Sequence, residues 1–485
     1  MSTAACNRIL SLGCVLTPLA LCWFRIGFIH PDLGIGGAER LVVDAAVGLQ
    51  KAGHDVTIYT AHHDPGHSFE ETHNGTLKVV VYGDWLPRSL CGSGRCMAVC
   101  AYLRVFYVSL RVLLNCGPFG SAANRYAALF VDQVSHSVPL LKAVGGEGLK
   151  VVFYCHYPDW MLTQRASCLK SLYRAPLDWA EEQSTGAADA ILVNSNFTAQ
   201  TFASAFAGLH KRGVRPSVLY PAINLAQQEL PEGAESSLDL SFGGATHIVL
   251  SINRYERKKN IGLAISAIGA LPPAQRRGLA LVIAGGYDTR VTENVEVDEE
   301  LKAQAEAAGL SGSTHFLRNI SNVDKLLLLQ RATCLLYTPD REHFGIVPVE
   351  AMYAKCPVVA VNTGGPLESI ADGETGFLRP QEPEQWAEAV GSLLTDSARQ
   401  KSMGEAGRWR ATSMFSLESF ARILDQQIRS LVAGAEGAPG RGGSAAAGGE
   451  SGDGAGKKDA GIASPVAART RGARRRKSTA KGGGS

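Results

Sequence analysis

Residues 26–59 read IGFIHPDLGIGGAERLVVDAAVGLQKAGHDVTIY, and this stretch decides the fold. Residues 26–29 and 56–59 are short apolar runs, which are typical of buried strands. Between them lie a Gly-rich loop and a helix whose apolar face carries Leu41, Val42, Ala45, Ala46 and Leu49. A strand, a helix and a strand in this order predict a βαβ unit, which requires parallel strands and a right-handed crossover.

The same alternation continues on both sides of a polar segment, 225–244, that is rich in Glu and Ser and predicts a linker. We expect further strands at 151–154 and 190–193 before it, and at 247–252, 279–284, 314–317, 333–337 and 357–361 after it. The pattern predicts an α/β protein of two Rossmann-like, doubly wound domains, 25–222 and 246–433, joined by a linker at 223–245. An amphipathic helix at 417–431 would close the second domain, and a ligand would bind in the cleft where the strands end.

The composition separates a folded body from a tail. The 485 residues are 45% hydrophobic and 19% charged, which is typical of a globular chain. Residues 434–485 hold ten Lys or Arg, four Asp or Glu, fifteen Gly and no aromatic residue, so we expect a disordered basic tail. The tail carries +6 and the whole chain +3, which leaves −3 for residues 1–433. This nearly neutral body argues against nucleic acid as a partner of the folded core.

Two apolar segments bear on membrane association. Residues 9–24 carry no charge but fall short of the ~20 residues of a spanning helix, so the leader 1–24 is either an uncleaved anchor or dispensable. Residues 96–116 contain two charges, Arg104 and Arg111, which lie seven positions apart and share one helical face. This segment predicts either a basic amphipathic helix at a membrane surface or a core helix with two exposed arginines.

The cysteines indicate a reducing compartment. There are eleven, an odd number, with no C-x-x-C pair, and several lie within apolar runs. We therefore expect neither a disulfide framework nor a structural zinc site. His62, His63, Asp64 and His67 imitate a metal site, but we interpret them as an acceptor-facing loop.

Loops between a predicted strand and a helix hold the candidate site residues. Gly36 and Gly37 would let the backbone approach a ligand closely at a helix N-terminus, although a tight turn explains two glycines equally well. Arg254 and Lys259 belong to RYERKK, with four cations in six positions. These cations would repel one another unless an anion lay nearby, which predicts a diphosphate site rather than a solvated basic loop.

A third loop contains two carboxylates. Glu342 lies just before the helix that contains Glu350, so one carboxylate can face a sugar while the other reaches a ribose. The alternative for Glu350 is a carboxylate that complements the helix dipole. Residues 362–368, NTGGPLE, repeat the Gly-Gly arrangement and would add backbone amides to the same cleft.

Taken together, these motifs resemble glycosyltransferase family 4, whose members have the GT-B fold. The likeness is carried by GGAER at 36–40, R-x4-K at 254–259 and E-x7-E at 342–350. Longer stretches are similar to the family's alpha-1,3/1,6-mannosyltransferases of the dolichol pathway, among them HPDLGIGGAERLVVDAA, FYCHYPD, LSINRYERKKN and EHFGIVPVEAMY. The likeness covers about residues 26–431 and excludes the leader and the tail.

The resemblance implies a retaining mannosyltransferase, with GDP-mannose as donor and mannosyl-GlcNAc2-diphosphodolichol as acceptor. Two mannoses would be added, the first α1,3 and the second α1,6. Arg254 and Lys259 would bind the donor diphosphate and stabilise charge on the departing GDP. Glu342 would contact the mannose, Glu350 the ribose hydroxyls, and His156 the sugar from the opposite side. Gly36 and Gly37 would admit a diphosphate or the acceptor, and the turn Phe344, Gly345 and Ile346 would complete the donor site.

The resemblance also implies no cofactor. The chain has no D-x-D segment, which agrees with a fold that needs no divalent metal. The expected location is the cytosolic face of the endoplasmic reticulum membrane, with other transferases of the pathway as candidate partners. Two alternatives stay open at this point: another family 4 transferase with a different donor or lipid acceptor, and a catalytically silent scaffold at a membrane surface.

Overall fold

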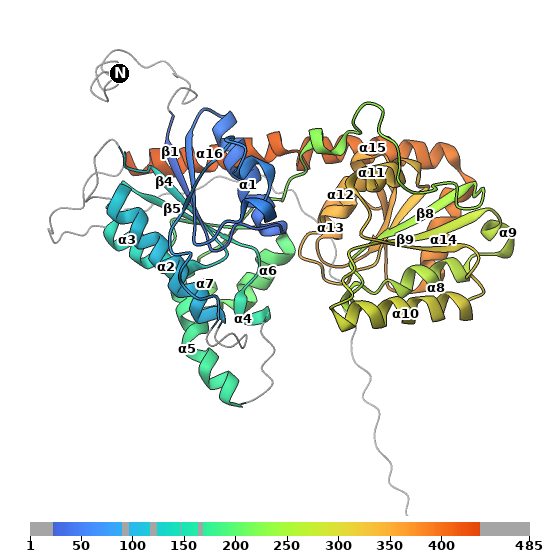
Figure 1. Cartoon of the computed structure of the whole chain (residues 1–485), viewed down its shortest axis with the longest axis horizontal. Coiled ribbons are helices and arrows are strands. Elements are labelled where there is room, and N and C mark those ends of the chain that lie inside the picture. Colours follow the sequence, from blue (N-terminus) through green and yellow to red (C-terminus); the bar gives the residue numbers. More distant parts are fainter. Residues whose placement is uncertain (1–22, 90–96, 117–123, 147, 163–167, 437–485) are drawn as a thin grey trace, which may run out of the picture. The chain divides into compact units, whose positions relative to one another are not determined.

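Two parallel β-sheets form the frame of the protein. The computed structural model describes residues 23–436, apart from 90–96, 117–123, 147 and 163–167. Within these residues the chain builds a seven-stranded and a six-stranded sheet, each with helices on both faces (Figure 1). The prediction of an α/β protein with two Rossmann-like, doubly wound domains is confirmed.

The N-terminal sheet has the strand order β3-β2-β1-β4-β5-β6-β7, and all its pairs are parallel. Its strands are β1 Arg25–His30, β2 Asp55–Thr60, β3 Lys78–Val81, β4 Ala128–Asp132, β5 Lys150–Cys155, β6 Ala190–Val193 and β7 Ser217–Val218. The helices of this domain are α1 Gly37–Lys51, α2 Met97–Cys116, α3 Val138–Val144, α4 Asp159–Leu162, α5 Cys168–Thr185, α6 Asn196–Ala205 and α7 Ala207–Lys211.

The C-terminal sheet has the order β10-β9-β8-β11-β12-β13, also parallel throughout. Its strands are β8 His247–Ile252, β9 Leu279–Gly285, β10 Thr314–Arg318, β11 Cys334–Tyr337, β12 Val358–Val361 and β13 Gly376–Arg379. The helices that follow β8 are α8 Gly262–Ala270, α9 Pro273–Arg276, α10 Thr292–Ala307, α11 Asn322–Arg331, α12 Ile346–Tyr353, α13 Pro366–Ser369, α14 Pro383–Thr395, α15 Ser397–Phe415 and α16 Leu417–Glu436.

Each sheet is buried on both faces, which explains the continuous apolar runs of its central strands. In the N-terminal domain, α1 and α16 cover one face and α2, α3 and α6 cover the other. In the C-terminal domain, α8, α10 and α14 lie on one face and α11, α12 and α15 on the other.

The sequence pattern missed four strands: β3, β4, β7 and β13. The omission of β4 matters most, because this strand lies between β1 and β5 at the centre of the N-terminal sheet. All five of its residues are buried. A five-residue apolar run has no periodicity that separates a strand from a piece of core helix.

Helix α16 differs from its predicted role as the closing element of the C-terminal domain. Its buried residues Leu417, Phe420, Leu424 and Ile428 belong to the core of the N-terminal sheet, where α16 packs against α1. Gly48 permits this approach, because a Cβ there would lie 2.6 Å from the Cβ of Ala421. Figure 1 shows α16 running along the N-terminal domain while α15 stays with the C-terminal one.

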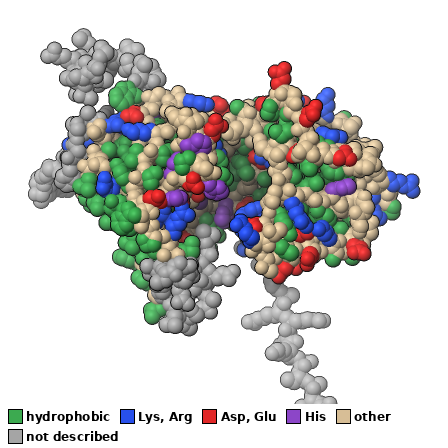
Figure 2. Space-filling model, viewed as in Figure 1, with side chains coloured by type: hydrophobic (Ala, Val, Ile, Leu, Met, Phe, Trp, Pro, Cys, Tyr) green, Lys and Arg blue, Asp and Glu red, His purple; other side chains and the backbone are tan. Residues whose placement is uncertain are grey.

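The arginines of α2 are not exposed as the sequence analysis expected. Arg104 is only 5% exposed, and Arg111 is half-buried with its guanidinium 5.0 Å from the ring centre of Tyr82. The exposed side of the helix is instead apolar and consists of Met97, Leu103, Phe106, Leu110 and Leu114, which we call the α2 stripe. Hydrophobic side chains gather over this part of the domain in Figure 2. Among the described residues, α2 is the one helix long and apolar enough to cross a membrane.

The linker at 223–245 is packed against the C-terminal domain. Ile223 and Leu240 are buried in its core, and the hydroxyls of Ser236 and Ser237 donate to the carboxylate of Asp324 at the start of α11. The leader falls almost wholly outside the described residues, as does the basic tail from residue 437 onward.

Candidate active site

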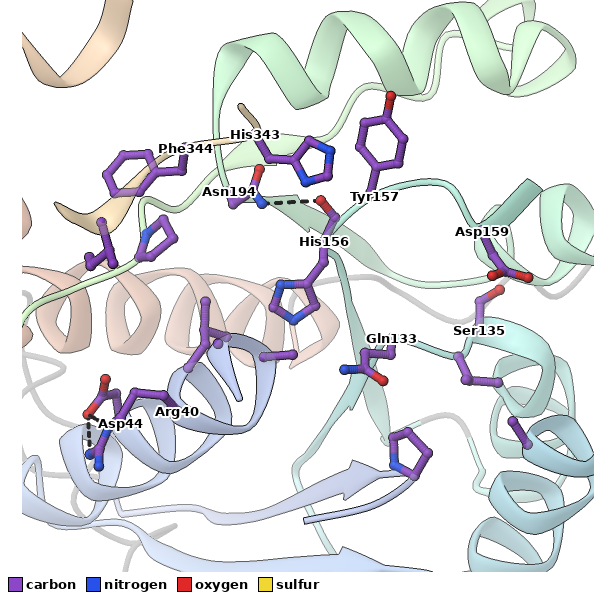
Figure 3. A pocket seen from close by; sticks show the side chains of 18 of the residues that line it. Arg40, Asp44, Gln133, Ser135, His156, Tyr157, Asp159, Asn194, His343 and Phe344 are labelled. Carbon is purple, nitrogen blue, oxygen red and sulfur yellow. Dashed lines mark hydrogen bonds and ion pairs between the residues drawn. The ribbon is translucent and has the colours of Figure 1, made fainter. Parts of the chain in front are cut away.

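A cavity of about 710 Å³ lies where the strands of the N-terminal sheet end and the turn 342–346 of the C-terminal domain begins. Pro31, Gln133, His156 and Asn194 line it directly after β1, β4, β5 and β6. Figure 3 shows Gln133, His156 and Asn194 converging from different strands. The carboxyl ends of parallel strands meet at one edge, so the predicted cleft is found where the topology requires it.

Gly37 is the first residue of α1 and lines this cavity, and the position of its missing Cβ is open space. A ligand can therefore approach the backbone at the helix N-terminus. Gly36 serves a different purpose, because a Cβ there would lie 2.2 Å from a carboxylate oxygen of Glu39. The absence of a side chain lets Glu39 fold back over the first turn of its own helix.

The cations of RYERKK are compensated by carboxylates rather than by one shared anion. Arg254, 64% exposed, and Lys258, 68% exposed, both pair with Glu256. Arg257 points away from the cavity and pairs with Glu296 and Glu300 on α10. The predicted repulsion is thus relieved within the protein, and three of the four cations are not directed at a common ligand.

Lys259 is the exception. Its side chain is 12% exposed, and its Nζ lies 2.5 Å from Oε2 of Glu342 in the turn before α12. The hydroxyl of Thr338, after β11, donates to the Lys259 carbonyl at 2.7 Å and fixes the loop in place. The structure therefore brings together two predicted site residues from separate loops. Four predicted site residues do not line the described cavity: Gly36, Arg254, Lys259 and Glu350. Lys259 adjoins it through its contact with Glu342.

The turn around Glu342 is shaped by glycines. Gly345 has a φ of +81°, and a Cβ there would lie 2.8 Å from the Tyr337 hydroxyl. The Gly365 N–H donates to the Glu342 carbonyl at 2.8 Å, and a Cβ at Gly365 would lie 2.1 Å from the Phe344 carbonyl. The second Gly-Gly pair thus supports the turn, and its Gly365 amide is not free for the cleft as predicted.

The predicted donor residues of this turn line the cavity: Glu342, Phe344, Gly345 and Ile346. His343 lines it as well, and its ring stacks on Tyr157 of the N-terminal domain with ring centres 4.0 Å apart. Burial lowers the pKa of His343, so this ring is neutral near pH 7 and offers a flat surface.

Glu350 lies within α12 and is 11% exposed. Its Oε1 accepts a hydrogen bond from Nζ of Lys325 on α11 at 2.9 Å. Sequence analysis did not single out Lys325, because it lies 25 positions earlier on a different helix. Glu350 therefore has a specific cationic partner, which a carboxylate that only complements the helix dipole does not need.

His156 is 24% exposed and lines the cavity after β5. Its Nε2 lies 2.8 Å from Oδ1 of Asp132, whose Oδ2 is 2.9 Å from Nδ1 of His30. The Asn194 amide donates to the His156 carbonyl at 3.1 Å, as the dashed line in Figure 3 marks. His30 and Asp132 are both fully buried, and sequence analysis identified neither.

The far end of the cavity holds more polar groups that the sequence did not reveal. Tyr102 on α2 stacks on His136 with ring centres 3.5 Å apart, and its hydroxyl donates to Asp159. Burial lowers the pKa of His136 to about 4, so this ring is neutral at pH 7, and it raises the pKa of Glu181 to about 7, so this carboxyl group is partly protonated there. Imidazole, carboxyl and phenol groups beside aromatic rings are well suited to bind sugar hydroxyls.

The histidines of the loop after β2 have separate partners. His62 pairs with Asp84, His63 lies within hydrogen-bond distance of the Thr72 hydroxyl, and Asp64 accepts from the Gly66 N–H. Within the described part of the chain, no group of three His, Cys, Asp or Glu side chains could hold a metal ion. The described cysteines, Cys100, Cys116, Cys155, Cys334 and Cys356, are free thiols.

Comparison with known proteins agrees with this geometry. The model of the family Glycosyltransferase Family 4 matches residues 35–227, and that of Glycosyl transferases group 1 matches residues 239–410. Sucrose-phosphate synthase from Thermosynechococcus elongatus superposes with a TM-score of 0.64 at 21% identity, covering 85% of this chain and 100% of the other. The glycosyltransferase WaaG superposes with a TM-score of 0.56 at 18% identity, covering 83% and 99%. At these identities the structures establish the fold alone.

Two sheets with a site between their strand ends, matched by both families, define a glycosyltransferase with the GT-B fold. Sequence relatives narrow the class further. The alpha-1,3/1,6-mannosyltransferase ALG2 of Homo sapiens is 47% identical over 411 residues, which cover 84% of this chain and 95% of the relative. That of Saccharomyces cerevisiae is 42% identical over 440 residues, covering 84% and 85%. The chain belongs to the ALG2 family of alpha-1,3/1,6-mannosyltransferases.

Proposed function

We propose that this protein transfers mannose from GDP-mannose to mannosyl-GlcNAc2-diphosphodolichol, first in α1,3 and then in α1,6 linkage. The observation that carries the proposal is the identity of 41–47% to ALG2 relatives over 84% of the chain. The two matched family models, over residues 35–227 and 239–410, include every predicted site residue. The sugar nucleotide and the lipid-linked oligosaccharide are the two kinds of substrate that this family implies.

The site supports a reaction that depends on leaving-group stabilisation. An α-linked donor that yields an α-linkage reacts with net retention, and the motifs contain no carboxylate recognisable as a nucleophile for a double displacement. A front-face reaction with an oxocarbenium-like transition state then requires chiefly that charge on the departing GDP is stabilised. Lys259, whose ammonium group pairs with the cavity-lining Glu342, is the residue best placed to supply that charge.

The other predicted residues have complementary roles in this proposal. Glu342 contacts the mannose once the donor diphosphate has taken its place beside Lys259. Arg254, exposed on the same loop, closes onto the diphosphate from outside. Glu350, which pairs with Lys325, accepts hydrogen bonds from the ribose. His156 faces the sugar from the N-terminal domain.

The acceptor sugars fit the end of the cavity near Tyr102, His136 and Asp159. Tyr102 belongs to α2, so one side of this helix lines the cavity while another side carries the exposed α2 stripe. Half-exposed leucines and a phenylalanine in one row are suited to the interface of a bilayer. We propose that the enzyme lies at the endoplasmic reticulum membrane, with the α2 stripe against the lipid and the site on the cytosolic side.

An assay with purified full-length protein, GDP-mannose and a synthetic mannosyl-chitobiosyl-diphospholipid tests the proposal. We expect two successive products, one and then two hexoses heavier than the acceptor, with GDP released. Because no metal is required, the reaction should proceed in EDTA. Turnover with a UDP-sugar but not with GDP-mannose would refute the donor assignment, and a strict need for Mn²⁺ would refute the metal-independent mechanism.

A further inference from the structure

Three neighbouring strands of the N-terminal sheet bring three ionisable side chains to one point. In the order β1-β4-β5, His30 is the last residue of β1, Asp132 the last of β4, and His156 follows the end of β5. His30 and Asp132 have no exposed side-chain surface, whereas the His156 ring reaches the cavity. A charged carboxylate is costly to bury unless each oxygen has a partner, and here each oxygen has an imidazole.

The contacts among His30, Asp132 and His156 determine which of their atoms carry hydrogen. Burial opposes the ionisation of Asp132, but contact with His156 and His30 keeps the pKa of Asp132 below its usual range. An ionised carboxylate can only accept, so Nδ1 of His30 and Nε2 of His156 both carry hydrogen. Burial favours neutral His30, yet hydrogen bonding and charge from Asp132 and Glu39 raise the pKa of His30 to about 9. His30 is thus an imidazolium that balances Asp132.

This arrangement determines which nitrogen of His156 faces a ligand. Nε2 of His156 is hydrogen-bonded to Asp132, and Nδ1 has no hydrogen bond to any described residue. With hydrogen on Nε2, the uncharged form of His156 has Nδ1 as a hydrogen-bond acceptor at the cavity surface.

We propose that Asp132 is a positioning residue of the transferase, and that the buried pair His30–Asp132 holds His156 with Nε2–H inward and Nδ1 ready to accept from a sugar hydroxyl. This inference rests on the proposed function, because it assigns the sugar as the ligand of His156. A hydrogen bond to a fixed acceptor orients the sugar relative to Lys259 across the cavity. Misplacing a reacting group by about 1 Å costs on the order of 10²-fold in rate.

A double-mutant cycle in full-length protein separates positioning from a general structural role. Asp132→Asn offers one acceptor oxygen and one N–H group to the two imidazoles, so Nδ1 of His30 and Nε2 of His156 can no longer both donate hydrogen to this side chain. We expect kcat to fall about 10²-fold with much smaller changes in KM, and the same change to have almost no further effect in a His156→Ala background. An equal loss in both backgrounds would overturn the proposal.

Asp425→Asn is the matched control. Asp425 pairs with buried His54 at 2.7 Å in a second His–Asp contact, between α16 and the N-terminal domain, and neither residue lines the cavity. We expect kcat to stay within about twofold of wild type. A loss of kcat as large as that of Asp132→Asn would show that breaking any buried His–Asp contact is enough, and would overturn the proposal.

The tautomer can also be read in the wild-type protein, without relying on the folding of Asp132→Asn. Ring-¹⁵N labelled histidine, assigned for His156 by comparison with His156→Ala, should show Nε2 protonated and Nδ1 bare at pH 7. A protonated Nδ1 would refute the positioning role. Wild-type protein that transfers no hexose would refute the proposed function, whereas an active wild type with an unaffected Asp132→Asn variant would refute only this inference.

Discussion

The ammonium group of Lys259 lies 2.5 Å from a carboxylate oxygen of Glu342, although the two residues are 83 positions apart in the sequence. The pair joins the loop after β8 to the loop after β11, which are neighbouring strands of the C-terminal sheet. Without a donor, the cation is thus already held in place and neutralised. A donor diphosphate that displaces the carboxylate would leave Glu342 free to turn to the sugar.

Lys259→Ala should lower kcat by about 10²–10³-fold, because its charge is most valuable when GDP departs. Lys258→Ala is the matched control, since this neighbouring lysine is 68% exposed and pairs with Glu256. Steady-state kinetics with GDP-mannose measures both variants. If Lys259→Ala stayed within about twofold of wild type, Lys259 would not belong to the site.

Glu350→Gln should act mainly on donor binding. If Glu350 accepts hydrogen bonds from the ribose in both the ground and transition states, donor KM should rise about tenfold while kcat changes little. Glu405→Gln is the control, because this carboxylate pairs with a lysine on the surface and is 52% exposed. A fall in kcat with unchanged KM would place Glu350 in the chemical step instead.

The sequence predicted most strands, because nine apolar runs between turn residues fall on strands of the structure. Lys259 and Glu342 were predicted as site residues because each lies in a loop after a recognised strand, whereas His156 was predicted only through the family resemblance. Asp132 was missed because it is the last residue of β4, the central strand that the sequence pattern did not predict. The side chains that hold a site residue in place are found only when every strand is known.

The periodicity of the sequence also did not show which face of a helix is buried. Arg104 and Arg111 share a face of α2 as predicted, but that face packs against the domain and the apolar one is exposed. A pattern shows which residues lie together, and the neighbouring surface decides which face is buried. The same limit explains α16, whose apolar stripe was recognised but assigned to the wrong sheet.

The α2 stripe predicts a change in membrane binding. Replacing Leu103, Phe106 and Leu110 together by Ser should weaken binding to lipid vesicles at least about tenfold, because each is 37–59% exposed and would lose apolar contact with lipid. Trp409→Ser is the control, since Trp409 is 70% exposed on α15 in the other domain. Vesicle co-sedimentation measures both variants. Unchanged binding of the triple variant would show that the α2 stripe does not contact the membrane.

The buried imidazolium of His30 predicts a pH-dependent stability. With a pKa of 6.5 unfolded and about 9 folded, His30 stabilises the fold fully below pH 6.5, and this contribution is lost as the pH rises to about 9. The shift corresponds to about 3 kcal/mol. The difference in unfolding free energy between wild type and His30→Gln should therefore shrink between pH 6.5 and 9 in urea titrations. A constant difference across this range would show that His30 is not charged in the folded protein.

The side of the membrane that the site faces determines whether one surface asparagine is glycosylated. The sequence contains the glycosylation sequons Asn74-Gly75-Thr76, Asn196-Phe197-Thr198 and Asn319-Ile320-Ser321. The Asn196 amide donates to Glu368 and Tyr220, and that of Asn319 donates to the Tyr287 carbonyl, so both can escape modification through their folded contacts. Asn74 lies in an exposed turn and is the informative reporter.

If the site faces the cytosol, where GDP-mannose is made, Asn74 should carry no glycan when the protein is expressed in its own type of cell. Endoglycosidase treatment should then leave its mobility unchanged. The positive control is the same chain directed into the lumen by a cleavable signal sequence, in which Asn74 should be modified and Asn74→Gln should abolish the shift. A shift at Asn74 in the unaltered protein would place this domain in the lumen, away from its proposed donor. Protease digestion of sealed microsomes gives an independent measurement, because a cytosolic domain is degraded without detergent.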